Sequence, residues 1–172
     1  FVPVPINHEW GYLSGQVIIK VHEGDMPADA EPYAVLSDNN TVLTFYYDEH
    51  KAERNGMDIG PFNDSDKQSW YNQRESITTA VFDESFANCT SLTSTFLWFY
   101  GCRNMVSISG IQYLKTDNVT DMSRMFDSCS SLTSLDVSGF NTENVTHMYD
   151  MFYMCSSLTS IDVSHFNTFN VK

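Results

Sequence analysis

Residues 119–144 read VTDMSRMFDSCSSLTSLDVSGFNTEN, and residues 145–170 read VTHMYDMFYMCSSLTSIDVSHFNTFN. The two stretches are identical at 18 of 26 positions without a gap, so they are copies of one structural unit. Two less regular copies precede them. One runs from Trp98 to Val119 with one inserted residue, and an abbreviated one begins at Phe82. The second half of the chain is therefore a repeat array.

Each unit divides into a predicted short helix and a predicted short strand. Met122, Met125, Phe126 and Cys129 follow the i, i+3, i+4, i+7 spacing that places side chains on one helical face. The segment LTSLDV at 132–137 then alternates apolar and polar residues, as a strand does. One turn of helix and one strand cannot bury their apolar faces alone. Stacked copies can, with their strands side by side in a parallel sheet.

The four cysteines follow the repeat. Cys89, Cys102, Cys129 and Cys155 are separated by 13, 27 and 26 residues, and no C-x-x-C pair occurs. This spacing is not that of zinc ligands. We expect a ladder of small buried thiols, with stacked disulfides as the alternative. No histidine or acid stands at a fixed offset from the cysteines, so a catalytic thiol is not expected.

The repeat phrase also resembles a known bacterial family. NVTDMSRMFDSCSSLTSLDVSGFNT at 118–142 and EPYAVLSDNNTVLTFYYD at 31–48 resemble the BspA-like leucine-rich-repeat surface proteins, also described as the Mycoplasma-type lipoprotein repeat. The resemblance covers about residues 32–172. It implies an α/β fold, a right-handed leucine-rich-repeat solenoid with a short helix and a short parallel strand in each 26-residue coil. It also implies export to the cell surface and adhesion to host proteins or other cells, and it brings no catalytic residues.

The first half of the chain is organised differently. Tyr33–Ser37 and Val42–Tyr47 are β-rich runs separated by DNNT, which predicts a hairpin. Because a solenoid needs its exposed end covered, we expect this hairpin to form an N-terminal β cap. The predicted strand at Val17–Val21 belongs either to an extra strand on that cap or to a linker.

These patterns give three predicted regions. They are an extra strand or linker at 1–31, a β cap and loop at 32–80, and a solenoid at 81–172 that is open at its C-terminal end.

Charge and composition exclude several functions. The net charge is −13, and nine basic residues scattered along the chain do not form the clusters that nucleic acid or an anionic membrane requires. No apolar run approaches the roughly 20 residues of a membrane-spanning helix. The five histidines form no H-x-x-x-H or H-E-x-x-H set, and no phosphate loop or G-x-S-x-G elbow occurs. We expect no metal, no cofactor and no enzymatic activity.

The positions at which the two repeats differ are the best candidates for function, since identical positions are mostly scaffold. In the last repeat these differences introduce large side chains at positions expected to face outward, and such side chains are favoured in interfaces. The alternative is that they pack against neighbours. Two acids on the predicted strands would bind a cation or a basic partner, or would simply be solvated and held by nearby Ser and Thr. The ligand-binding candidates are Tyr149, Tyr153, Met154, His165, Phe169, Asp136 and Asp162.

A series of asparagines recurs with the repeat at Asn118, Asn144 and Asn170. We expect their amides to hydrogen-bond backbone groups in the turns between coils.

Three functional hypotheses follow. The leading one is a secreted or cell-surface module that binds a protein or glycan ligand; the chain begins at Phe1, and we expect its targeting signal to have been removed. The second is a structural spacer that projects other domains. The third is an accessory domain of a larger secreted enzyme.

Overall fold

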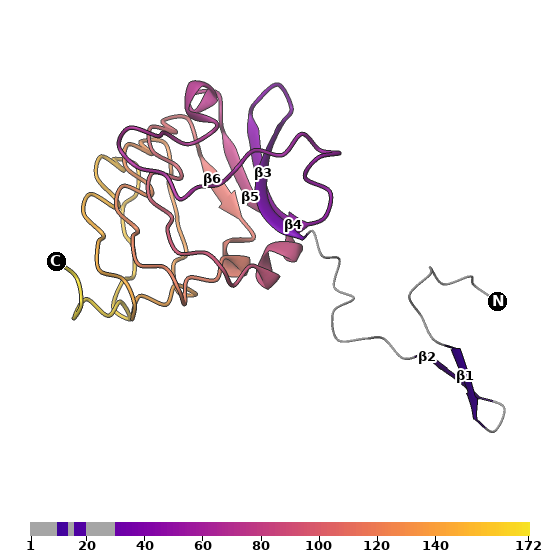
Figure 1. Ribbon diagram of the computed structural model, residues 1–172. Coiled ribbons are helices and arrows are strands. Elements are labelled where there is room, and N and C mark those ends of the chain that lie inside the picture. Colours follow the sequence, from indigo (N-terminus) through magenta and orange to yellow (C-terminus); the bar gives the residue numbers. More distant parts are fainter. Residues whose placement is uncertain (1–9, 14–15, 20–29) are drawn as a thin grey trace. The chain divides into compact units, whose positions relative to one another are not determined.

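The computed structural model describes residues 10–13, 16–19 and 30–172 (Figure 1). The chain divides into two compact units, residues 1–30 and residues 31–172. In the first unit, β1 (Trp10–Leu13) pairs with β2 (Gln16–Ile19) in an antiparallel register that sets Trp10 opposite Ile19. The strand predicted at Val17–Val21 coincides with β2 as far as Ile19, and its last two residues lie outside the described residues.

The second unit begins with a four-stranded mixed sheet in the order β3-β4-β5-β6. Its strands are β3 (Glu31–Ser37), β4 (Val42–Asp48), β5 (Thr79–Phe82) and β6 (Ser107–Ser109). β3 and β4 form the predicted antiparallel hairpin, while β4–β5 and β5–β6 are parallel pairs. Asp38, Asn39 and Asn40 in the hairpin turn all have positive φ (50, 57 and 67°), a conformation that Asp and Asn tolerate better than most residues.

Aromatic side chains join this sheet to the repeats. Phe45 in β4 stacks on Phe82 in β5 at 4.7 Å and on Trp98 at 5.0 Å. Trp98 belongs to the copy just before residue 119; from here on we call residues 92–118 the first repeat and leave the abbreviated copy before it unnumbered. All three side chains are buried. The sheet and the repeats therefore share one hydrophobic core.

The predicted leucine-rich-repeat solenoid, with a helix and a strand in every coil, is wrong. Within residues 30–172 the helical segments are three short 3-10 turns, η1 (Tyr71–Gln73), η2 (Glu84–Asn88) and η3 (Ile111–Tyr113). The segment predicted as a helix at 122–129 is a series of turns, and the segment predicted as a strand at 132–137 has no regular secondary structure. Of the strands in the sheet, β6 alone belongs to a repeat, so the predicted parallel sheet does not run along the array.

Hydrogen bonds between successive repeats replace those of the predicted helix. The backbone N–H groups of Met122, Arg124, Phe126 and Ser128 donate to carbonyls of the next repeat, the third (residues 145–170), at 2.8–2.9 Å. Arg124 and Ser128 adopt left-handed backbone conformations (φ 54 and 64°), which a right-handed helix cannot accommodate. An amide that donates to the neighbouring repeat is also not available for a helical bond four residues back. Figure 1 shows the resulting loops side by side from orange to yellow.

The loop after β4, together with the hairpin, contacts the first repeat. The carbonyls of Trp98 and Tyr100 correspond to those of Met125 and Asp127, which accept N–H groups from the preceding repeat. In the first repeat their donors are instead side chains of the loop after β4, Trp70 Nε1 (2.9 Å) and Gln68 Nε2 (3.1 Å). Two side-chain donors thus satisfy these carbonyls, which a preceding repeat would otherwise pair.

Equivalent side chains of successive repeats form columns in the interior. Phe99, Phe126 and Phe152 stack in nearly parallel planes at 5.4 and 5.7 Å. The predicted thiol ladder is confirmed for Cys89, Cys102 and Cys129, which are free and buried, while Cys155 is free but half-buried.

Hydrogen bonds connect the thiols and the asparagines to the preceding repeat. Cys129 Sγ donates to the Phe99 carbonyl at 3.2 Å, and Cys155 Sγ to the Phe126 carbonyl at 3.1 Å. The predicted structural role of the asparagine series is confirmed, since each amide donates to a backbone carbonyl about one repeat earlier. The bonds run from Asn118 to Thr90, from Asn144 to Asp117 and from Asn170 to Glu143.

Candidate binding surface

Three large side chains of the third repeat are exposed within one run of turns. Tyr149 is 47% exposed, Tyr153 58% and Met154 61%. We call residues 149–154 the aromatic turn. These three predicted site residues therefore belong to one local surface.

Backbone hydrogen bonds hold the aromatic turn in place. The Tyr149 carbonyl accepts the Arg124 N–H at 2.9 Å, and the Tyr153 carbonyl accepts the Ser128 N–H at 2.8 Å. Met154 has a left-handed backbone (φ 55°), as Ser128 has at the equivalent position of the second repeat (residues 119–144). The exposed side chains are thus carried on a backbone that is fixed to the preceding repeat.

The equivalent positions of the second repeat do not face outward. Ser123, which corresponds to Tyr149, is fully buried, and Asp127, which corresponds to Tyr153, is buried as well. The expectation that most of the varied positions face outward is therefore wrong for Ser123 and Asp127. The exposed aromatic surface belongs to the third repeat alone.

Tyr149 lies between an aromatic ring and a charged cluster. Its ring centroid is 6.5 Å from that of Phe96, and the Arg124 guanidinium carbon lies 5.5 Å from it. Arg124 is 3.6 Å from Asp64, 3.8 Å from Asp127 and 3.6 Å from Asp150. Partial burial, and then the negative charge of Asp64, raise the pKa of the Tyr149 phenol, so it is neutral at physiological pH.

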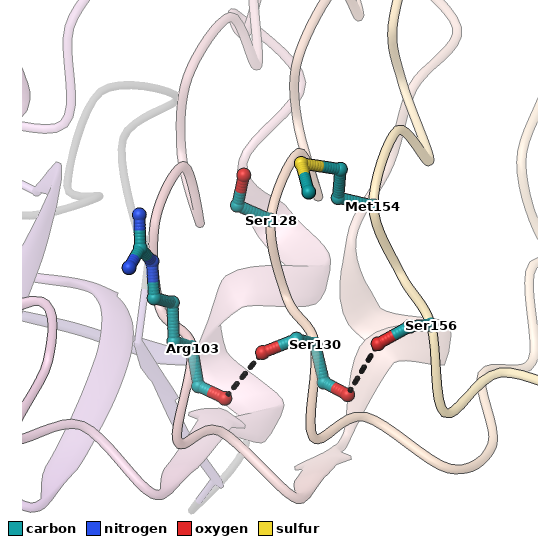
Figure 2. A pocket seen from close by; sticks show the side chains of 5 residues that line it. All are labelled: Arg103, Ser128, Ser130, Met154 and Ser156. Carbon is teal, nitrogen blue, oxygen red and sulfur yellow. Dashed lines mark hydrogen bonds between the residues drawn. The ribbon is translucent and has the colours of Figure 1, made fainter.

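A hollow lies beside the aromatic turn and crosses three repeats (Figure 2). Its lining residues are Arg103, Ser128, Ser130, Met154 and Ser156. The hydroxyl of Ser130 donates to the Arg103 carbonyl at 3.3 Å, and that of Ser156 to the Ser130 carbonyl at 3.4 Å. Figure 2 shows the Arg103 side chain reaching along its own repeat toward the level of Ser128 and Met154.

Asp136, Asp162 and His165 lie together elsewhere on the repeats. Each carboxylate accepts a backbone N–H two residues later, Asp136 from Ser138 and Asp162 from Ser164, both at 2.9 Å. These bonds to Ser138 and Ser164 lower the pKa of both carboxyls, and the positive charge that His165 can carry lowers it further. His165 Nε2 is 3.0 Å from the Val137 carbonyl. The two aspartates thus fit the structural alternative, in which the turns hold them as solvated carboxylates.

Phe169 is 90% exposed and lies in a later turn, at 169–170. The structure thus sorts the predicted site residues into the aromatic turn, the Asp136–Asp162–His165 group and Phe169.

Three residues next to the aromatic turn were not among the sequence candidates. Asp64 is far from the repeats in sequence and reaches Arg124 only through the fold, so no sequence signal marks it. Phe96 stands in the irregular first repeat, where no identical copy reveals its position. Arg103 could have been found, because it occupies the position that Ser130 and Ser156 hold in the later repeats.

The repeats match one protein family. A family described as "Mycoplasma protein of unknown function, DUF285" matches residues 87–172, which is half of the chain. The chain belongs to the DUF285 family. The match therefore shows the Mycoplasma-type part of the resemblance and leaves the BspA-like leucine-rich-repeat part without support. No curated protein and no solved structure matches the chain.

The DUF285 match includes all residues of the aromatic turn, and its description assigns no function. In the part of the chain that the structure describes, no helix has the length and apolar character needed to cross a membrane. Nor do the described residues bring three His, Cys, Asp or Glu side chains into an arrangement for a metal ion.

Proposed function

We propose that this DUF285 protein is a binding module, secreted or displayed at the cell surface, whose aromatic turn recognises a protein or glycan ligand. Its role is binding without catalysis. The observation that carries the proposal is the exposure of Tyr149, Tyr153 and Met154 together on one turn. Tyr and Met are enriched in interface cores relative to the rest of a protein surface.

The fixed backbone supports the same proposal. Because the Tyr149 and Tyr153 carbonyls are bonded to the second repeat, the turn is already ordered before a ligand arrives. A preordered surface loses less conformational entropy on binding than a flexible loop would. Tyrosine adds large contact area with few rotatable bonds.

The experiment is a binding screen of the chain against immobilised extracellular-matrix proteins and a glycan array. Tyr149→Ala and Tyr153→Ala are each expected to weaken binding of a ligand found there by about tenfold or more, the loss typical of interface hot spots. Phe169→Ala is the matched control, since it removes an even more exposed aromatic from a different turn.

The same melting temperature in all variants would show that the fold is kept. Absence of any ligand, or equal binding by the Tyr149 and Tyr153 variants and the wild type, would refute the proposed function.

A further inference from the structure

The surroundings of the aromatic turn are acidic at its Tyr149 end. Asp64 and Asp150 each lie 3.6 Å from Arg124, whose guanidinium carbon is 5.5 Å from the Tyr149 ring centroid. After partial burial, the negative charges of Asp64, Asp121 and Asp150 raise the pKa of the Tyr149 phenol. These carboxylates come from the loop after β4, the second repeat and the third repeat. Asp64 and Asp150 are exposed, and Asp121 is half-buried. We call these three residues the acidic rim. Three separate segments thus place carboxylates around one exposed aromatic ring.

Arg124 does not balance this charge. Asp64, Asp127 and Asp150 lie within 4 Å of the Arg124 guanidinium, and Asp121 is a fourth carboxylate acting on Tyr149. Four carboxylates and one guanidinium leave the cluster with a formal net charge of about −3. The distances from Arg124 to its carboxylates, 3.6–3.8 Å, are longer than hydrogen bonds. Its buried Nε has no hydrogen-bond acceptor. Repulsion among the carboxylates is therefore only partly offset within the protein.

We propose that the aromatic turn binds a basic protein surface, with an arginine or lysine side chain lying on the exposed part of Tyr149 beside Asp64 and Asp150. This inference rests on the proposed binding function and narrows its partner. Arg124 already shows that a guanidinium fits near the ring and these two carboxylates. A second cation would be attracted both by the quadrupole of the Tyr149 ring and by the unbalanced negative charge of the cluster.

The partner chemistry follows from charge. The chain carries a net charge of −13, which attracts basic proteins over distance and repels acidic glycans. Neutral glycans would leave the acidic rim unpaired. Arg103 lies at the other end of the surface, in the hollow beside Met154, so the predicted contact for a cation is the Tyr149 end.

The probe is a short, fluorescently labelled peptide in which arginines alternate with glycines. A peptide of the same length with citrulline in place of arginine is its control, because citrulline keeps the shape of arginine and lacks the charge. Fluorescence anisotropy with the full chain gives both affinities. We expect the arginine peptide to bind at least about tenfold more tightly at low salt, with the difference shrinking toward physiological ionic strength as screening sets in.

Paired variants locate the contact. Asp64→Asn combined with Asp150→Asn is expected to weaken binding of the arginine peptide by about tenfold, and Asn suits the left-handed backbone of Asp150 (φ 55°). Asp136→Asn combined with Asp162→Asn removes the same charge elsewhere on the repeats and should change the affinity less than about twofold. Tyr149→Phe keeps the ring and should retain binding, whereas Tyr149→Ala should lose most of it.

Several results would overturn the inference. One is an equal affinity of the wild-type chain for the citrulline peptide and the arginine peptide, a measurement that does not depend on the folding of any variant. Another is an equal loss of affinity for the arginine peptide in the Asp64/Asp150 and Asp136/Asp162 double variants, which would mean that the peptide is attracted by the overall negative charge of the protein. A ligand from the screen that needs Tyr149 and Tyr153 but is indifferent to Asp64 and Asp150 would also overturn it, and the proposed function would stand. If Tyr149→Ala and Tyr153→Ala change no binding at all, both proposals fail.

Discussion

Phe126 is the side chain whose removal tests the stacked interior most directly. It is fully buried and lies between Phe99 at 5.4 Å and Phe152 at 5.7 Å, with both ring pairs nearly parallel. Phe126→Ala therefore opens a cavity in the middle of the aromatic column and breaks two ring contacts. Phe152 is the matched position one repeat later, with a stacked ring on one side and half-buried.

The expected losses of unfolding free energy follow from this difference in burial and in stacked neighbours. Truncating a fully buried Phe to Ala typically costs about 3–5 kcal/mol, the sum of lost transfer free energy and a cavity term. We expect about 4 kcal/mol for Phe126→Ala. Phe152 buries less surface and has one stacked neighbour, and each ring pair is worth about 0.5–1.5 kcal/mol. For Phe152→Ala we therefore expect roughly 2 kcal/mol, about half the loss.

Urea unfolding of the wild type and both variants measures these losses, followed by circular dichroism and by tryptophan fluorescence. Coincident transitions from the two probes would justify a single free energy of unfolding for each protein. If Phe152→Ala cost as much as Phe126→Ala, or if Phe126→Ala cost less than about 1.5 kcal/mol, the two-sided stacking would not be the contact that holds the repeats together.

Three further perturbations test other parts of the structure. Trp70→Phe should lower the free energy of unfolding by about 1–3 kcal/mol, because it leaves the buried Trp98 carbonyl without its hydrogen-bond donor. Unchanged urea unfolding would mean that this hydrogen bond does not stabilise the first repeat. Burial raises the pKa of the Cys102 thiol to about 12, so native alkylation followed by mass spectrometry should modify half-buried Cys155 well before Cys102, and simultaneous modification would count against the thiol ladder. Burial alone would raise the pKa of Asp48, but hydrogen bonds, the largest from Tyr33, outweigh it and lower the pKa below its ordinary 3.8. A lowered folded-state pKa stabilises the fold above the ordinary value, and this stabilisation is lost as the pH falls through the folded value. Asp48→Asn should therefore flatten the fall of unfolding free energy below about pH 4, whereas an unchanged acid profile would show that Asp48 contributes nothing there.

The sequence by itself identified the repeated apolar side chains that are buried. Met122, Met125, Phe126 and Cys129 are all buried, as their spacing predicted, and the asparagine series makes the expected backbone contacts. Both results follow from repetition. A position that returns in each repeat meets its own copies in the neighbouring ones, so its side chain is selected for that contact.

The secondary structure of the repeats was decided only by the tertiary fold. The spacing i, i+3, i+4, i+7 reports which side chains share a buried face, and a series of turns can provide that face as well as a helix can. The deciding fact is where the amides donate: those of Met122 and Phe126 bond to the next repeat rather than within their own. No local propensity encodes a partner that lies a whole repeat away.

The residues around the aromatic turn also form two groups, those that the sequence indicated and those that only the tertiary fold placed there. The differences between the two repeats pointed to Tyr149, Tyr153 and Met154, because a side chain that departs from a repeated scaffold stands out in the sequence alone. Asp64 became part of that surface only when the loop after β4 was packed against the second repeat beside Arg124. A short-range pattern marks what a segment contributes, whereas the charge that surrounds it depends on which distant segments the folded chain brings near.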